Sequence, residues 1–148
     1  MEWLTKLQGK IVGLDTAPLI YFIEEHTAYL DTLKEFFESV DKDKVSVVTS
    51  TITLTEVLVH PLRSQNVDLA AEYRDILLNS NITTLDISSE IAEYGALLRS
   101  QYNLRTPDAL QIATAIKSGA DFLLTNDTKL PKIPSIDYLV LDTLVNKS

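Results

Sequence analysis

The hydrophobic and polar positions of this chain follow two spacings in turn, and each spacing predicts one kind of element. Short runs of apolar and β-branched residues predict buried strands, and they lie at residues 11–14, 45–49, 82–85, 122–125 and 138–141. Between these runs, apolar residues recur three and four positions apart, which predicts helices with one apolar face. The helices are expected around residues 29–40, 52–59, 69–77, 87–102 and 107–118.

The residues that follow the helical patterns predict where the helices end. His60 precedes Pro61, and because the residue before a proline is driven toward extended backbone, the helix that begins near residue 52 is expected to stop there. Gly119 is expected to end the helix over residues 107–118. The prolines within residues 129–135 predict a surface loop that leads to the last strand.

Strands that alternate with helices are typical of βαβ units. The predicted fold class is therefore α/β, a three-layer α/β/α sandwich with a mainly parallel central sheet. The chain has 148 residues, which suits one domain over residues 1–148. No internal repeat, low-complexity tract or long linker divides the sequence.

The composition narrows the environment and the partners of the protein. The chain has no cysteine, no apolar signal stretch at its start and no run of about 20 apolar residues that would span a membrane. We therefore expect a soluble cytoplasmic protein that does not associate with membranes. The net charge of −8 argues against a non-specific nucleic-acid coat, whose affinity comes from Lys and Arg. It permits a nuclease whose bound cations offset the acids.

Four carboxylates stand where predicted strands give way to helices or loops, at Asp15, Glu56, Asp108 and Asp127. In an open α/β sheet, functional sites gather at the carboxyl ends of the strands. Carboxylate oxygens, in a chain with no cysteine and two histidines, suit Mg²⁺ or Mn²⁺. We predict that Asp15, Asp108 and Asp127 surround the metal, directly or through water, and that Glu56 holds a metal-bound water or acts as a general base.

Each acid also has an ordinary structural explanation. Asp15 can cap the helix that follows it, and Glu56 stands three residues after Thr53, which is the spacing of a capping box. Asp108 follows a proline at a predicted helix start, and Asp127 can belong to a plain turn. Against these explanations, Asp108 and Glu56 lie on apolar helical faces, so both are expected to point inward, where a bound cation would relieve their repulsion.

Polar and basic residues near the four acids are candidates for supporting roles. Thr16, Thr125 and Asn126 are expected to orient the acids or to contact phosphate, although turn and capping roles explain them as well. The candidate phosphate contacts among the basic residues are Arg63, Arg99, Arg105, Lys117 and Lys129.

Four segments resemble, in order, the four motifs of PIN-domain ribonucleases: LDTAPLIY at residues 14–21, STITLTEVL at 50–58, TPDALQIATA at 106–115 and ADFLLTND at 120–127. A chain of this length is most similar to the VapC-type toxins of toxin–antitoxin pairs. The resemblance implies a ribonuclease that uses Mg²⁺ or Mn²⁺ to hydrolyse RNA phosphodiester bonds. It also implies a homodimer and a protein antitoxin whose tail blocks the acidic site.

The predicted helix around residues 29–40 carries a wide apolar stripe of Tyr29, Leu30, Leu33, Phe36 and Phe37. A stripe of this width predicts that part of it packs on another chain, as in a homodimer, unless it closes over the protein's own sheet.

Two other functions are compatible with parts of the sequence. A phosphotransferase could use Asp15 as its nucleophile, but the haloacid-dehalogenase-like pattern wants a second Asp two positions on, where this chain has Ala17. A catalytically silent PIN-fold binding module would be expected to lack one of the four acids, and all four are present.

Overall fold

A computed structural model describes residues 2–145 and places five strands in one sheet. The strands are β1 (Ile11–Leu14), β2 (Ser46–Ser50), β3 (Thr83–Leu85), β4 (Phe122–Thr125) and β5 (Asp137–Val140). They lie in the order β3-β2-β1-β4-β5, and every neighbouring pair is parallel. The predicted strands and the parallel sheet are therefore confirmed, whereas residues 1 and 146–148 of the expected domain lie outside the described part.

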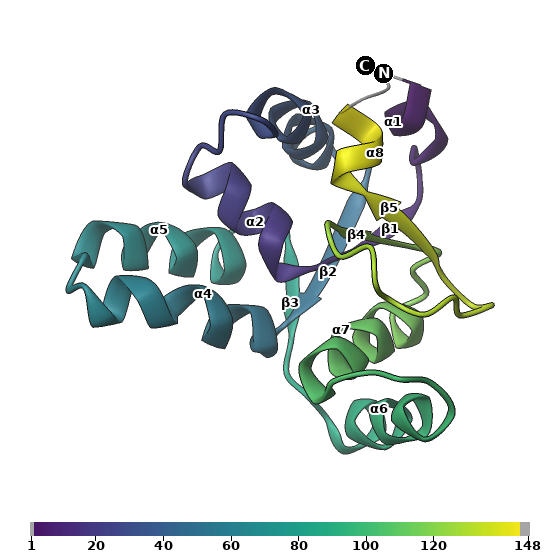
Figure 1. The fold of residues 1–148 in the computed structure, drawn as a ribbon. Coiled ribbons are helices and arrows are strands. Elements are labelled where there is room, and N and C mark those ends of the chain that lie inside the picture. The colour runs from purple at the N-terminus through teal and green to yellow at the C-terminus, as the bar shows by residue number, and fades with distance from the viewer. Residues whose placement is uncertain (1, 146–148) are drawn as a thin grey trace.

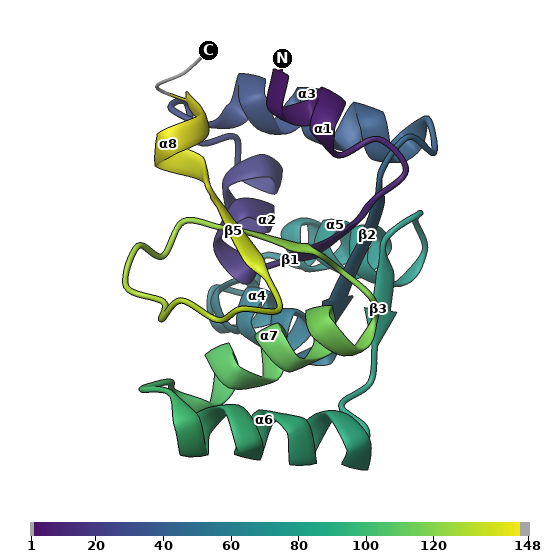
Figure 2. The same cartoon turned by 90° about the vertical axis from the view of Figure 1, so that its right-hand side faces the viewer.

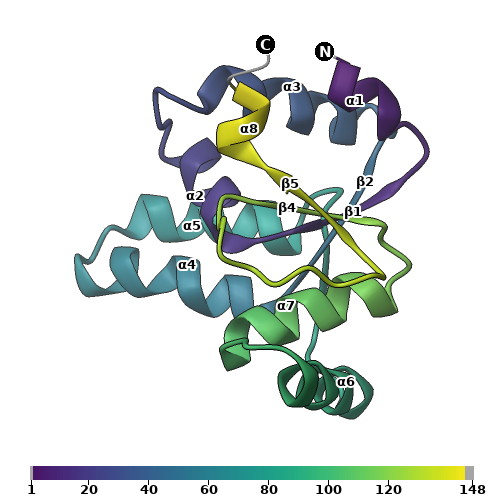
Figure 3. The same ribbon diagram turned by 45° about the vertical axis from the view of Figure 1, so that its right-hand side comes forward.

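Eight helices are described, and they flank the sheet (Figure 1). They are α1 (Glu2–Lys6), α2 (Thr16–Ile23), α3 (Leu30–Asp41), α4 (Thr51–Arg63), α5 (Val67–Leu78), α6 (Ser89–Gln101), α7 (Thr106–Lys117) and α8 (Leu141–Val145). Figures 2 and 3 show α6 and α7 on one side of the sheet and α3 with α8 on the other. The three-layer α/β/α sandwich is thus confirmed.

The strand residues alternate between two apolar cores, one on each face of the sheet. Val12, Leu14 and Leu124 pack into the core formed with α2, α3, α4, α5 and α8. Leu123 packs into the other core, formed with α6 and α7. Both faces of the central strands are therefore covered, which is why their sequences read as continuous apolar runs. Across residues 2–145, no helix is long and apolar enough to cross a membrane.

Helix α4 continues through Pro61, and the prediction that it stops at His60 is wrong. Proline removes one backbone donor from a helix interior, but Pro61 is buried and lies only two residues from the end at Arg63. The His60 carbonyl still accepts a hydrogen bond from the Ser64 N–H at 2.9 Å. Burial of the ring and the nearby helix end offset the lost hydrogen bond.

The apolar stripe of α3 is used inside the molecule. Leu33, Phe36 and Phe37 are all buried in the core of the single chain, and Phe37 stacks on Phe22 of α2. These three side chains therefore close over the protein's own sheet and are not open to another chain, whereas Tyr29 and Leu30 stay partly exposed.

Candidate active site

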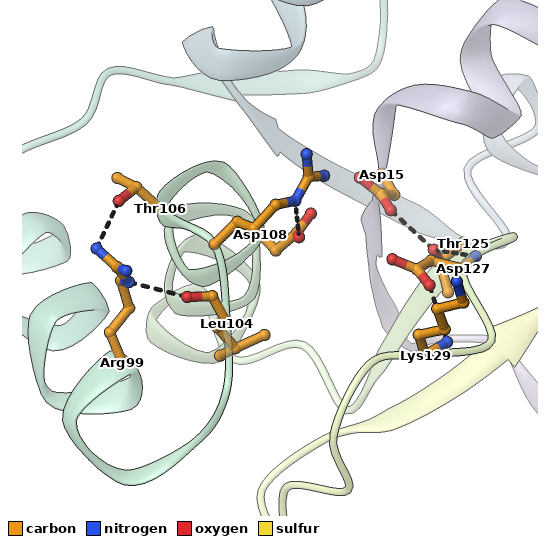
Figure 4. Close-up of polar contacts among 9 residues, drawn as sticks. Asp15, Arg99, Leu104, Thr106, Asp108, Thr125, Asp127 and Lys129 are labelled. Atoms are coloured by element: carbon orange, nitrogen blue, oxygen red, sulfur yellow. Dashed lines mark hydrogen bonds and ion pairs between the residues drawn. The ribbon is translucent and has the colours of Figure 1, made fainter.

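The carboxyl ends of the adjacent strands β1 and β4 bring Asp15 beside Thr125 and Asp127. The Thr125 hydroxyl donates a hydrogen bond of 2.7 Å to Asp15 Oδ2, and the Asp127 N–H donates to the Thr125 hydroxyl at 3.1 Å. Figure 4 shows Asp15, Asp108 and Asp127 around one space, with Asp108 approaching from α7. Three of the four predicted acids therefore come from segments that meet at this edge of the sheet.

Asp15 caps α2 and also faces this space, so its two predicted roles coexist. Its Oδ1 accepts the Thr16 N–H at 2.9 Å. Burial is the main cause that raises the pKa of the Asp15 carboxyl above its ordinary value, against the hydrogen bonds from Thr125 and Thr16, which lower it. The negative charges of Asp108 and Glu56 raise the pKa further. Asp15 is thus a desolvated acid that is repelled by the negative charges of two neighbouring acids.

Asp108 lies in the first turn of α7, as predicted, and its side chain is 19% exposed. Its Oδ2 lies 3.1 Å from Arg105 Nε. The distance between α7 and β1 is unusually short, because a Cβ built on Gly13 would lie only 2.6 Å from the Ala115 Cβ. The missing side chain of Gly13 therefore lets α7 pack closely against β1.

Glu56 is exposed on α4, and the prediction that it points inward is wrong. The buried face of α4 consists of Thr53, Val57 and Pro61, which leaves Val59 46% exposed. The capping-box explanation is also wrong, since Ser50 caps the helix and Thr53 is fully buried. Glu56 nevertheless reaches the site, because the Thr16 hydroxyl donates to its Oε1 at 2.6 Å.

Asn126 and Asp127 point in different directions. Asp127 Oδ1 accepts the Lys129 N–H at 2.8 Å, so the residue shapes the turn that leaves β4. The side chain of Asn126 donates to the Tyr29 hydroxyl at 3.2 Å and accepts the Asp142 N–H at 3.0 Å. Asn126 therefore ties β4 to the start of α8, and these two hydrogen bonds direct its side chain to Tyr29 and Asp142.

A buried polar network lies beneath the acids, and the sequence analysis missed it. The Ser50 hydroxyl donates to Gln111 Oε1 at 2.7 Å, and Gln111 Nε2 donates to the Thr53 hydroxyl. The Thr53 oxygen also lies 3.2 Å from the Thr16 oxygen and 3.0 Å from the Thr49 oxygen. The network thus joins α7 to α4 and α2 under the site. A glutamine within the apolar run of α7 was the available signal.

The family model for the PIN domain matches residues 12–136. This chain belongs to the PIN domain family. Three solved structures resemble the PIN domain described above. VapBC2 from Rickettsia felis bound to a DNA fragment from their promoter has 24% sequence identity and a TM-score of 0.71, over 88% of this chain and 98% of that one.

The second structure is a toxin-antitoxin complex from Klebsiella pneumoniae, with 27% identity and a TM-score of 0.66 over 86% of this chain and 95% of that one. The third is VapC20 of Mycobacterium tuberculosis, a sarcin-ricin loop cleaving toxin, with 19% identity and a TM-score of 0.62 over 77% of this chain and 87% of that one. No curated protein matches the sequence.

The acids of the PIN domain fit a hard cation by their chemistry. Asp15 is desolvated beside two further carboxylates, which is the situation that a divalent cation relieves. All the nearby ligand atoms are oxygens, which Mg²⁺ and Mn²⁺ prefer. As the side chains stand in residues 2–145, no three of the acidic or histidine residues are gathered closely enough to hold a metal ion.

The candidate basic residues separate into two groups. Arg99, Arg105 and Lys129 line a cleft of about 360 Å³ together with Asp108 and Asp127.

Lys117 lies elsewhere in the PIN domain. Its Nζ lies 3.4 Å from Glu90 and 4.9 Å from the centre of the Tyr94 ring. Arg63 is the last residue of α4.

Proposed function

We propose that this PIN domain is a metal-dependent ribonuclease that hydrolyses RNA phosphodiester bonds. The observation that carries the proposal is the environment of Asp15, a desolvated carboxyl whose pKa is raised in part by Asp108 and Glu56. A buried carboxylate beside other carboxylates destabilises the fold. A bound cation would offset this cost, which explains why the acids stand together. The folds of the toxins of known structure support the same proposal.

In the proposed reaction, Asp15, Asp108 and Asp127 hold Mg²⁺ or Mn²⁺, directly or through water. When bound, the metal supplies an activated water and stabilises charge on the phosphodiester. The residues of the chain supply orientation. Thr125 and the Thr16 N–H fix the two oxygens of Asp15, and the Thr16 hydroxyl orients Glu56, which accepts the proton of the attacking water as a general base.

We further propose that the protein is the toxin of a VapBC-type toxin–antitoxin system, acting in the cytoplasm with a protein antitoxin. One of the similar structures is a toxin-antitoxin complex, and another is VapBC2 bound to a DNA fragment from their promoter. Exposed apolar side chains on α4 and α5 suit a protein partner, namely Val59, Leu62, Val67 and Leu78. A homodimer stays a prediction from the family resemblance, because Leu33, Phe36 and Phe37 of the stripe are buried within the chain.

The proposal is tested with purified wild type, Asp15→Asn and Asp41→Asn, incubated with RNA in Mg²⁺, in Mn²⁺ or in chelator. Asp41 is an exposed acid that precedes β2 at the opposite edge of the sheet, so it is a matched control. We expect metal-dependent cleavage by wild type and Asp41→Asn, and no cleavage by Asp15→Asn. Cleavage that persists in Asp15→Asn or in chelator would contradict the proposal, and a folded wild type that cleaves no RNA would favour a silent binding module.

A further inference from the structure

Three basic side chains gather in one cleft of an otherwise acidic protein. The chain has 13 Lys and Arg residues against 21 Asp and Glu residues, yet Arg99, Arg105 and Lys129 share the cleft that Asp108 and Asp127 border. The cleft lies between the α6–α7 connection and the β4–β5 connection. Its basic wall is therefore next to two of the proposed metal-binding acids.

Arg105 has hydrogen-bonding capacity that its ion pair does not use. Only its Nε is bonded to Asp108, at 3.1 Å, and its side chain is 78% exposed. A guanidinium carries five N–H donors, so its terminal nitrogens can bind a second anion while Nε holds Asp108. An exposed ion pair contributes little to stability, so stability does not explain why an arginine stands there.

Arg99 and Asp127 fix the two sides of the cleft. Arg99 Nε donates to the Leu104 carbonyl at 2.9 Å, and Arg99 Nη1 donates to the Thr106 hydroxyl at 2.9 Å (Figure 4). These bonds hold the connection that carries Arg105. On the opposite side, Asp127 accepts the Lys129 N–H at 2.8 Å. These hydrogen bonds therefore hold in place the backbone that carries the exposed side chains of Arg105 and Lys129.

We propose that Arg105 and Lys129 bind the phosphodiester group that flanks the scissile bond of a single-stranded RNA, with Arg99 as a positioning residue. The inference rests on the proposed ribonuclease function. The cleft of about 360 Å³ is near the lower limit of small-ligand pockets, roughly 300 Å³, so its size suits a short segment of one strand. Thr16 and Glu56, which reach the site from α2 and α4, carry no positive charge, so the positive charge beside the acids comes from the cleft.

The test compares two double variants that remove the same charge. Arg105→Gln/Lys129→Gln changes the cleft, and Arg63→Gln/Lys117→Gln changes two cations outside it. Each is placed in an Asp15→Asn background that cannot cleave, and binding of a fluorescent single-stranded RNA is measured at several salt concentrations. We expect the cleft variant to bind about tenfold more weakly, and we expect the magnitude of the slope of log K against log salt to fall by about 0.7, the value for one neutralised phosphate on a single strand. The control variant should stay within about twofold of its parent, because it loses no bound phosphate.

The same substitutions in the cleaving enzyme give an independent readout. The cleft variant should raise KM with a smaller change in kcat, and its melting temperature should match that of wild type. Equal loss of binding in both double variants, or tighter binding of a duplex than of a single strand, would overturn the inference. If wild type cleaves RNA and the cleft variant has the same RNA affinity and KM, the phosphate site is refuted and the ribonuclease function stands. If wild type cleaves no RNA, the ribonuclease function itself is refuted.

Discussion

Gly13 of β1 and Ala115 of α7 approach so closely that a Cβ built on Gly13 would lie 2.6 Å from the Ala115 Cβ. Asp108 stands seven residues before Ala115 on the same helix, which is about two turns. The contact between Gly13 and Ala115 therefore sets how far the Asp108 carboxylate stands from Asp15, which follows β1 directly.

Gly13→Ala is expected to destabilise the protein by about 1–3 kcal/mol, the usual cost of overpacking a core. Urea unfolding measures the change. Gly95→Ala is the contrasting control, because the nearest atom to its Cβ would be the flexible end of Leu110 at 3.0 Å and the nearest backbone atom would lie at 3.8 Å. Alanine also gains about 0.5–1 kcal/mol over glycine in a helix. Adding Ala115→Gly to Gly13→Ala should restore part of the loss. If Gly13→Ala is as stable as wild type, the contact does not limit the position of α7.

A metal should raise the melting temperature of wild type, because a ligand that binds only the folded state stabilises it. In Asp108→Asn this gain should be lost in Mg²⁺ and Mn²⁺, since the amide removes the charge that the cation needs. Asp41→Asn, at the opposite edge of the sheet, should keep the full gain. An undiminished response of Asp108→Asn would identify Asp108 as a helix-start residue alone.

The raised pKa of Asp15 gives a pH dependence with a definite sign. The folded protein holds the proton of Asp15 more tightly than the unfolded chain, so the contribution of this group to the free energy of unfolding falls as the pH rises from the ordinary pKa of 3.8 through the raised pKa. In chelator, wild type should therefore lose stability relative to Asp15→Asn across that window. Denaturation curves recorded at several pH values measure the difference, and parallel curves for the two proteins would contradict the prediction.

Two substitutions at Asp127 separate its charge from its place in the turn. Asp127→Asn should abolish cleavage, because one negative charge leaves the site. Its metal-free stability should be unchanged or higher, because Asn keeps an oxygen that can accept the Lys129 N–H and the repulsion among the acids falls. Asp127→Ala loses the acceptor and should cost about 1 kcal/mol. Thermal unfolding in chelator distinguishes the two. A loss of about 2 kcal/mol or more in Asp127→Asn would show that the carboxylate itself holds the turn together.

The elements that the sequence predicted well are those with a strong local signal. The runs that became β1 and β4 are short, apolar and covered on both faces, so Asp15 and Asp127 could be placed at strand ends from the sequence. Which face of α4 is buried could not be predicted from the sequence, because that face includes a polar residue, Thr53, whose hydrogen-bond partners lie in other segments. Hydrophobic spacing therefore put Glu56 on the wrong side. Helices α1 and α8 were missed because five residues each are too few to show a period.

In the buried network beneath the acids, the backbone N–H of Ile52 determines which group donates and which accepts each hydrogen bond. The Ile52 N–H donates to the Ser50 hydroxyl, whose own hydrogen goes to Gln111 Oε1, so the amide of Gln111 can present only its NH₂ group to Thr53.

At the other end, the Thr49 hydrogen goes to the Leu14 carbonyl and the Thr16 hydrogen goes to Glu56. The single hydrogen of Thr53 thus faces two acceptors, Thr16 and Thr49. An amide nitrogen cannot accept, so this sequence of donors cannot be reversed. Glu56 lies at the end of this sequence and accepts the Thr16 hydrogen, so the buried network fixes the position of an exposed carboxylate on another helix.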